Sequence, residues 1–490
     1  MQFFERHVAA ACAIAILGLG ALPPAGSAEN PADKIPITTS SEEARKLFLQ
    51  GRDLAEKLRA TDARRYFEQA VAKDKTFALA HLSLANTAPT ARDFFDSVKQ
   101  AVTLAPKASE GERLLILGFD AGVKGNVAAQ KTDLTKVTQL YPKDERGQNA
   151  LGQYYFGQQD YASAIEAYKR ATVINPAFSQ PYNQLGYAYR FIGKYADAEQ
   201  AFKKYIEIIP DDPNPYDSYA ELLMKMGRFE DSIKNYDKAL SLSQNFVASY
   251  IGIGNDQIFM GKGEDARKTF ARLAGVARND AERRQALFWN AVSYIHEGAT
   301  DKALAEVQKE QAIAHAGGDL ANASADQNLM GDILLESGQP DKALPLYLKT
   351  VETMDRANVP AEVKEAVRRQ LLFDETRVAL AKGDIVTAKA KANAYALQVA
   401  TKKIPFEMRQ QHELAARIAI AEKDYPVAVQ ELEQASQRDP RVLYLLAVAL
   451  QGKGDSARAR EVCTQAANFN ELAVNYAYVR SKAREMLAKS

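Results

Sequence analysis

The chain has 490 residues, of which 47% are hydrophobic and 26% are charged, a composition sufficient for a continuous core with little sign of disorder. Lys and Arg total 63 against 62 for Asp and Glu, and the net charge of +1 excludes a global electrostatic attraction to nucleic acid or to an acidic membrane. A partner must therefore be recognised by local features of the surface.

The N-terminal residues have the pattern of a secretory signal peptide. Arg6 precedes an apolar run from Val8 to Leu22, and small residues follow at 26–28. We expect cleavage after Ala28, so that residues 1–28 are the signal peptide. An uncleaved anchor is the alternative, although the run is shorter than the roughly 20 apolar residues that a spanning helix needs. Cys12 lies inside the run and not at its end, which disfavours a lipoprotein.

Residues 29–40, with two prolines, are predicted to form a linker. Ser40-Ser41-Glu42-Glu43 is expected to open the first helix as a capping box. Degenerate helical repeats are then predicted over residues 41–110. Their small and aromatic residues are Gly51, Ala63, Phe67 and Ala70 in one unit and Ala85, Ala101 and Pro106 in the next.

A regular array is predicted for residues 111–280, because two sets of markers share one period. Leu-Gly pairs recur every 34 residues at Leu117-Gly118, Leu151-Gly152 and Leu185-Gly186, and prolines recur with the same period at Pro142, Pro176 and Pro210. Within each unit, apolar residues at three- and four-residue spacing predict two amphipathic helices.

Small residues indicate where the two helices of a unit approach closely, and glycines indicate where the first helix stops. The close-contact pairs are Gly152 with Ala164, Gly186 with Ala198, and Ala220 with Ser232. Left-handed glycines are expected between the helices at Gly125, Gly193, Gly227 and Gly261.

Residues 281–470 are predicted to continue the array as degenerate repeats with longer helices. Their turn glycines are Gly298, Gly338, Gly383 and Gly454, partnered by Ala303, Ala343, Ala388 and Ala459. A further unit surrounds Ala416, Ala428, Ala435 and Pro440. Cys463 falls at a core-facing offset and is expected to be a small buried residue without an internal disulfide. The charged tail at 471–490 is predicted to be a solvating helix that caps the array.

The repeated pattern, Leu-Gly-x-x-Tyr followed by Ala, an aromatic residue, Ala and Pro, resembles the tetratricopeptide repeat (TPR). Units that begin near Gly111, Glu145, Ser179, Pro213 and Val247 follow one another in phase. The resemblance implies an all-α fold, a right-handed α-solenoid of stacked antiparallel helix pairs. Each hairpin would cover the apolar faces of its neighbour.

The motifs of common catalytic and metal sites are incomplete. His412-Glu413 lacks the second histidine of the zinc-protease pattern, and Met260-Gly261-Lys262-Gly263 lacks the Ser or Thr and the preceding strand of a phosphate loop. There is no Gly-x-Ser-x-Gly elbow. We therefore expect no catalytic residues, no metal and no cofactor; an enzyme in the degenerate C-terminal half is the minor alternative. His81, His296 and His315 have no recurring spacing to carboxylates or cysteines, so they do not indicate a metal site.

The family resemblance also implies that the inner face of each first helix lines a concave groove for peptides. In the three best units the corresponding positions carry Asn149, Gln153 and Phe156, then Asn183, Tyr187 and Arg190, then Asp217, Glu221 and Met224. Asparagine can donate to and accept from a peptide backbone, Phe156 and Tyr187 offer apolar anchors, and Arg190 can pair with a carboxylate. An ordinary solvated inner face is the alternative for each residue. Relatives that capture a C-terminal carboxylate also carry lysines at these positions, which this chain lacks. The single tryptophan, Trp289, is expected to pack in a helix hairpin.

These observations predict a non-enzymatic scaffold or adaptor of the cell envelope, located in the periplasm or outside the cell. It would bind other proteins or peptides along the groove, bind no nucleic acid, and have no membrane span after signal cleavage. The alternative is a ligand-sensing or regulatory TPR module of a signalling or envelope-assembly system. The sequence does not indicate the oligomeric state, because fold alone does not determine function or partner.

Overall fold

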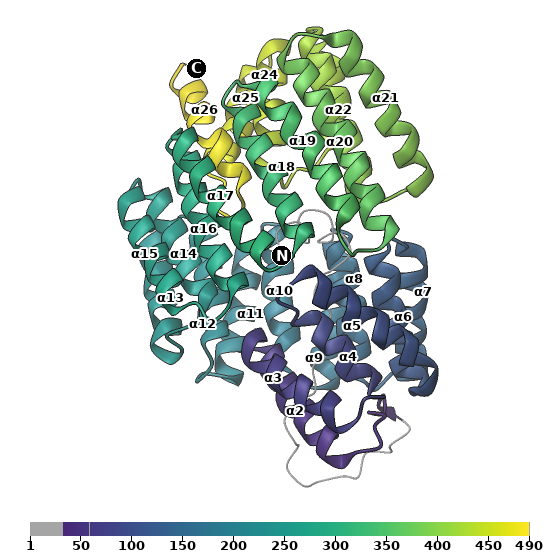
Figure 1. Cartoon of the computed structure of the whole chain (residues 1–490). Coiled ribbons are helices and arrows are strands. Elements are labelled where there is room, and N and C mark those ends of the chain that lie inside the picture. Colours follow the sequence, from purple (N-terminus) through teal and green to yellow (C-terminus); the bar gives the residue numbers. More distant parts are fainter. Residues whose placement is uncertain (1–32, 58, 490) are drawn as a thin grey trace. The chain divides into compact units, whose positions relative to one another are not determined.

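The computed structural model describes residues 33–57 and 59–489, so the signal-peptide prediction for residues 1–28 lies outside the described part. Every regular element in these two ranges is a helix, and within residues 42–208 and 263–489 each helix packs against the next helix along the chain (Figure 1). The predicted all-α solenoid of helix pairs is confirmed. None of the described helices is both long and apolar enough to cross a bilayer.

The helices belong to two compact units. The first unit comprises the described residues up to Leu222 together with Lys234–Ser249, and the second comprises Leu223–Ile233 and the residues from Tyr250 onward. The predicted boundaries between regular and degenerate repeats are based on repeat spacing and not on compactness, so these two units do not test them.

The first unit contains ten complete helices and most of two others. The complete ones are α2 (Glu42–Glu56), α3 (Ala60–Lys73), α4 (Ala78–Asn86), α5 (Ala91–Leu104), α6 (Glu110–Val123), α7 (Val127–Leu140), α8 (Glu145–Gly157), α9 (Tyr161–Ile174), α10 (Ser179–Phe191) and α11 (Tyr195–Ile208). A short 3₁₀ turn, η2 (Ala105–Lys107), follows α5. Helices α12 (Pro213–Lys225) and α13 (Phe229–Leu242) are shared with the second unit.

The second unit contains most of α14 (Val247–Phe259) and all later helices. These are α15 (Gly263–Val276), α16 (Asp280–His296), α17 (Thr300–Ala316), α18 (Leu320–Glu336), α19 (Pro340–Arg356), α20 (Ala361–Ala381), α21 (Ile385–Lys402), α22 (Pro405–Ala421), α23 (Tyr425–Gln434), α24 (Pro440–Lys453), α25 (Ser456–Ala467) and α26 (Asn475–Lys489). Helices α16–α22 have 17 to 21 residues, against 13 or 14 in α6–α15, so the prediction of longer helices is confirmed for this stretch. It does not hold for α23–α25, which have 10 to 14 residues.

The turn between the two helices of a pair requires a left-handed residue, and glycine usually provides it. All eight predicted turn glycines have φ between +72° and +90°. Gln159 and Lys423 adopt the same conformation, each with φ +63°, between α8 and α9 and between α22 and α23. The predicted turn glycines are therefore confirmed, although two other turns form without glycine.

The close approach within a hairpin is set by an aromatic ring. A Cβ atom added to Gly152 would lie 2.5 Å from Tyr168 Cε1, and one added to Gly186 would lie 2.5 Å from Phe202 Cε1. Both rings are fully buried, as is the predicted partner Ala164. The prediction that these glycines lie at close contacts is confirmed, but the group packed against each glycine is an aromatic ring and not the predicted alanine.

The first helix begins one residue later than a capping box at Ser40–Glu43 would require. Ser41 is the N-cap, and its side chain accepts a hydrogen bond from the backbone nitrogen of Ala44 at 3.1 Å. The residue three positions after this N-cap is an alanine, so the reciprocal glutamate contact cannot form and that prediction is wrong. A complete capping box occurs instead at Ser109 and Glu112, where α6 begins.

The described part of the predicted linker is fixed against the first unit. Ile35 is 3% exposed, its backbone nitrogen donates to Asp144 Oδ2 at 2.7 Å, and its carbonyl oxygen accepts from Arg146 Nη2 at 2.6 Å. The backbone nitrogen of Thr38 donates to Glu112 Oε1 at 2.7 Å. This extended segment therefore lies along the N-terminal ends of α6 and α8 and satisfies backbone groups that a free linker would leave to water.

The C-terminal helix α26 corresponds to the tail predicted to be a solvating cap. Helix α26 packs against α16 and α24 as well as against its neighbour α25. Tyr476 and Arg480 are at most 1% exposed, whereas Ser481 and Lys489 on the same helix are exposed. Only one face of α26 is solvated, because the other face packs into the second unit. Cys463 on α25 is fully buried, as expected.

Candidate functional site

The predicted binding residues occupy equivalent positions of consecutive first helices. Eight of them lie in the first unit, on α8, α10 and the first-unit part of α12. Met224 belongs to the second unit and is 1% exposed. The three rows at 34-residue spacing are Asn149, Asn183 and Asp217; Gln153, Tyr187 and Glu221; and Phe156 and Arg190.

Glu221 joins two of these helices. Tyr187 Oη donates to Glu221 Oε1 at 2.9 Å, and Arg190 Nη1 donates to Glu221 Oε2 at 2.9 Å. The Arg190 guanidinium also lies 5.6 Å from the centroid of the Tyr187 ring. Arg190 is only 4% exposed, so its charge is balanced within the chain by Glu221, and a peptide carboxylate is not needed to satisfy it.

The amide side chains of this face are incompletely hydrogen-bonded. Asn149 Nδ2 donates to Gln180 Oε1 at 2.8 Å, but Asn149 Oδ1, Gln153 Nε2 and Asn183 Oδ1 have no hydrogen-bond partner among the residues that the structure describes. All three side chains are at most 5% exposed. A buried polar atom without a partner costs about 1–3 kcal/mol. Three such atoms therefore lie on the two adjacent helices α8 and α10.

The remaining predicted residues have contacts within the chain. Asp217 accepts a hydrogen bond from Ser249 Oγ at 2.7 Å, and burial, together with the nearby Glu221, raises the pKa of Asp217 well above its usual value. Phe156 is half-buried, with its ring centroid 5.4 Å from those of Tyr161 and Phe191. Phe156 thus contributes to the hairpin core with part of its surface.

The sequence did not identify Gln180 as part of this face, although its Oε1 accepts the hydrogen bond from Asn149. Gln180 precedes Asn183 by three residues on α10, and this spacing places the two side chains on the same helix face. The spacing was the available signal. Ser249 carried no comparable signal, because it lies on the next first helix, and its pairing with Asp217 depends on how the helices pack.

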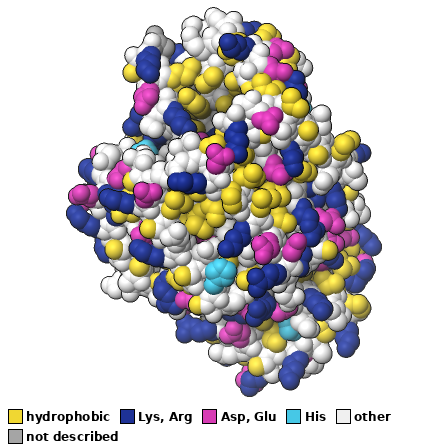
Figure 2. Space-filling view, turned by 45° about the horizontal axis from the view of Figure 1, so that its top comes forward, with side chains coloured by type: hydrophobic (Ala, Val, Ile, Leu, Met, Phe, Trp, Pro, Cys, Tyr) yellow, Lys and Arg dark blue, Asp and Glu magenta, His cyan; other side chains and the backbone are white. Residues whose placement is uncertain are grey.

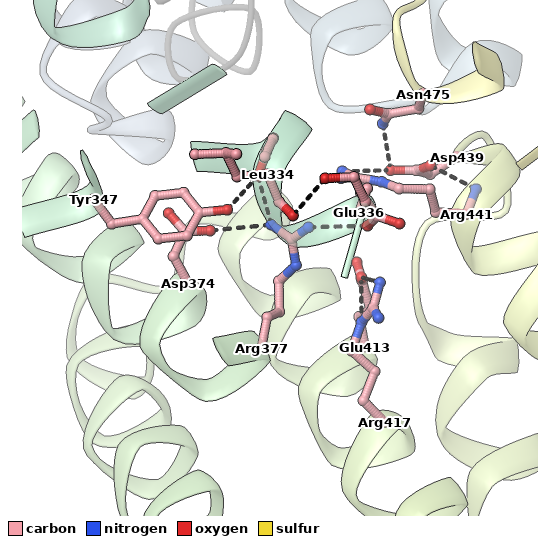
Figure 3. Close-up of polar contacts among 12 residues, drawn as sticks. Leu334, Glu336, Tyr347, Asp374, Arg377, Glu413, Arg417, Asp439, Arg441 and Asn475 are labelled. Carbon is pink, nitrogen blue, oxygen red and sulfur yellow. Dashed lines mark hydrogen bonds and ion pairs between the residues drawn. The ribbon is translucent and has the colours of Figure 1, made fainter. Parts of the chain in front are cut away.

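The second unit contains a buried ion-pair network centred on Arg377 of α20 (Figure 3). Arg377 Nη1 lies 2.8 Å from Asp332 Oδ1 and 3.2 Å from Asp374 Oδ1, and Nη2 lies 3.1 Å from Glu336 Oε1. Tyr347 Oη donates to Asp332 Oδ1 at 2.9 Å. These contacts join α18, α19 and α20, and we interpret them as structural links between adjacent hairpins.

No group of three metal-ligating side chains occurs among residues 33–57 and 59–489. His412 Nδ1 contacts Glu431 Oε2 at 2.7 Å, a single pair between α22 and α23. Trp289 is 8% exposed, and its ring centroid lies 5.1 Å from that of Phe288, consistent with packing. On the face shown in Figure 2, basic and acidic side chains are interspersed, and neither sign forms a continuous patch.

Helix pairs of similar length, a glycine under an aromatic ring and left-handed turns together define a helical-hairpin repeat protein. Sequence models of the tetratricopeptide repeat match residues 134–213, 214–246 and 251–319. The matched segments are therefore tetratricopeptide repeats. Curated proteins yield no match to this chain.

Several solved structures are similar to part of the chain. The crystal structure of MamA is 23% identical and covers 34% of this chain and 96% of its own, with a TM-score of 0.29. A TPR protein from Parabacteroides merdae is 16% identical and covers 54% of this chain and 99% of its own, with a TM-score of 0.37. YrrB, described as a TPR protein with an unusual peptide-binding site, is 18% identical and covers 37% of this chain and 91% of its own, with a TM-score of 0.26.

Proposed function

We propose that this protein is a non-enzymatic scaffold or adaptor that binds partner polypeptides along the first helices of its repeats. The observation that carries the proposal is the set of unpartnered amide atoms of Asn149, Gln153 and Asn183. They lie on α8 and α10, and Asn149 and Asn183 occupy equivalent positions of successive repeats.

The chemistry of this face suits an extended polypeptide. Each peptide unit offers one N–H donor and one carbonyl acceptor, and the unmet atoms include two acceptors, on Asn149 and Asn183, and one donor, on Gln153. Phe156 and Tyr187 are half-buried beside them and offer apolar contact area. Glu221 holds both Arg190 and Tyr187 in place through hydrogen bonds. These side chains therefore lose less conformational entropy when a peptide binds.

Peptide binding should depend on these amides more strongly than stability does. We expect peptides selected from a displayed random library on the wild-type protein to bind the Asn149→Ala/Asn183→Ala variant at least about tenfold more weakly, since a lost hydrogen bond in a buried site costs about 1–3 kcal/mol. The affinities would be measured by isothermal titration calorimetry on synthetic peptides. Thermal unfolding should shift modestly downward, because Asn149→Ala also removes the hydrogen bond to Gln180 Oε1, whereas the loss of the two unsatisfied acceptors has no cost.

The matched control is Asn393→Ala, which removes an exposed asparagine from α21, a second helix of the other unit. It should leave peptide affinity unchanged. Equal affinity of the selected peptides for wild type and for the double variant would place the binding surface elsewhere, and failure to select any peptide would count against polypeptide binding itself.

We further propose that the protein is exported and acts in the periplasm or outside the cell, without a membrane span after cleavage and without binding nucleic acid. The support is the Arg6, apolar-run and small-residue pattern of residues 1–28. Intact-mass measurement of the full-length gene product expressed in a bacterial host should give a chain that begins at Glu29. A mass that retains residues 1–28 would favour the uncleaved anchor.

A further inference from the structure

The C-terminal helix covers a first-helix position of the second unit. Asn255 on α14 follows Gln153, Tyr187 and Glu221 at the same 34-residue spacing, so it belongs to the same row of the repeat. Tyr476 on α26 donates from Oη to Asn255 Oδ1 at 2.8 Å. Both side chains are fully buried. Helix α26 therefore supplies a hydrogen bond to Asn255, whereas the equivalent Gln153 of the first unit has an Nε2 atom without a described partner.

Aromatic and cationic contacts reinforce this docking. The Tyr476 ring centroid lies 4.8 Å from that of Phe259 and 5.9 Å from that of His296 on α16. The Arg480 guanidinium lies 4.3 Å from the Phe259 centroid. Tyr476 and Arg480 are four residues apart, one turn of the helix, and so both project from the same face of α26.

Arg480 is buried and has no acidic partner within the described part of the chain. It is 1% exposed, and its Nη2 donates to the carbonyl oxygen of Phe469 at 2.7 Å and to Asn470 Oδ1 at 3.0 Å, while its Nε has no hydrogen-bond partner. Burial lowers the pKa of Arg480 to about 10. A cation held in this way is costly to bury, which makes this contact less stable than a purely apolar one of the same size.

The connection to α26 is a single segment from Asn468 to Val474. Glu471 anchors it through ion pairs with Lys225 at 2.7 Å and Arg438 at 3.5 Å. Only this segment joins α26 to α25, and one face of α26 is solvated, so α26 can separate from α16 without breaking the helix pair of α24 and α25. A helix with one solvated face can open locally at a lower free energy than the core.

We propose that the surface formed by α14 and α16 in the second unit is a second polypeptide-docking face, which α26 occupies in the free protein. The partner that fits it is an amphipathic helix carrying an aromatic hydroxyl and an arginine one turn apart, the pattern of Tyr476 and Arg480. Such a helix displaces α26 and takes over the contacts with Asn255 and Phe259. This surface differs in unit and in residues from the face proposed above.

The test uses the full chain and a fluorescent peptide of residues 475–489. The Tyr476→Ala/Arg480→Ala variant, whose own α26 is weakened, should bind the peptide at least about tenfold more tightly than wild type, because the intramolecular competitor is reduced. Adding Asn255→Ala and Phe259→Ala to this variant should abolish the increase in its affinity for the peptide. The control Ser481→Ala, on the exposed face of α26, should behave as wild type.

Hydrogen exchange on the unaltered protein provides a second measurement that does not depend on the variants. Amides of α26 should exchange faster than those of α24 and α25, and an excess of the unlabelled peptide should accelerate α26 further. Exchange of α26 only by global unfolding, unaffected by the peptide, would make it a structural cap and overturn the proposal. The Asn149→Ala/Asn183→Ala variant should retain this peptide binding, so failure of one proposed face is distinguishable from failure of the other.

Discussion

Replacement of Arg377 by methionine is expected to lower the free energy of unfolding by about 3–5 kcal/mol, since it leaves buried carboxylates without their cation. The guanidinium contacts Asp332, Asp374 and Glu336, and the side chain is 4% exposed (Figure 3). Urea unfolding followed by the fluorescence of Trp289, the single tryptophan and a residue of the same unit, measures the loss.

The loss should grow with pH. Burial and the nearby Asp332 raise the pKa of Asp374 to about 7, against the opposing charge of Arg377. Burial also opposes ionisation of Glu336, yet Arg377 and Lys482 hold its pKa below the usual value. Removal of Arg377 therefore raises both pKa values. A carboxyl group with a raised pKa in the folded state contributes stability below its unfolded pKa and loses it as pH rises through the folded value. The destabilisation should thus be smaller near about pH 5 than near about pH 8.

The matched control is Arg368→Met on the same helix. Arg368 pairs with Asp355 at 2.6 Å, and its side chain is 50% exposed. Exposed ion pairs contribute only about 0–1 kcal/mol, so this substitution should have a small effect at either pH. A similar loss in both variants, or a loss from Arg377→Met that is independent of pH, would show that the network is not the source of the stability.

The features predictable from sequence were those that repeat. The 34-residue spacing, the turn glycines and the glycine in each close contact are local features, and each recurs in several units. A position recognised in one unit therefore predicts the equivalent position in the next. The same periodicity identified Asn149 and Asn183 as equivalent positions. Single-copy details were less accessible: the N-cap lies at Ser41 because backbone geometry at that residue decides which serine faces the helix end.

Contacts between distant residues could not be predicted at all. Tyr476 and Asn255 are 221 positions apart, and the charged composition of the C-terminal tail indicated a solvating helix. The pairing of Arg190 with Glu221 likewise depends on the rotamers chosen when α10 and α12 pack together. Periodicity identifies which residues share a row, whereas tertiary packing determines whether their polar atoms are satisfied within the chain.

Replacement of Gly254 by alanine is expected to destabilise the second unit by about 1–3 kcal/mol, although alanine is the better helix former. An added Cβ would lie 2.2 Å from Phe270 Cε1 and 2.3 Å from Cζ, and the ring is 1% exposed and enclosed on its other sides. Gly275→Ala on α15 is the matched control, because nothing lies within 4 Å of its added Cβ.

The two glycine substitutions should therefore have opposite signs. Gly275→Ala is expected to stabilise the protein by about 0.5–1 kcal/mol, since it reduces the freedom of the unfolded chain without a clash. Urea unfolding of Gly254→Ala, Phe270→Leu and the double variant completes the cycle, and the double variant should lose less than the sum of the single losses because the smaller side chain makes room for the methyl group. Additive losses would mean that the glycine is not required by the ring, and the close contact would then not be what sets the spacing of the hairpin.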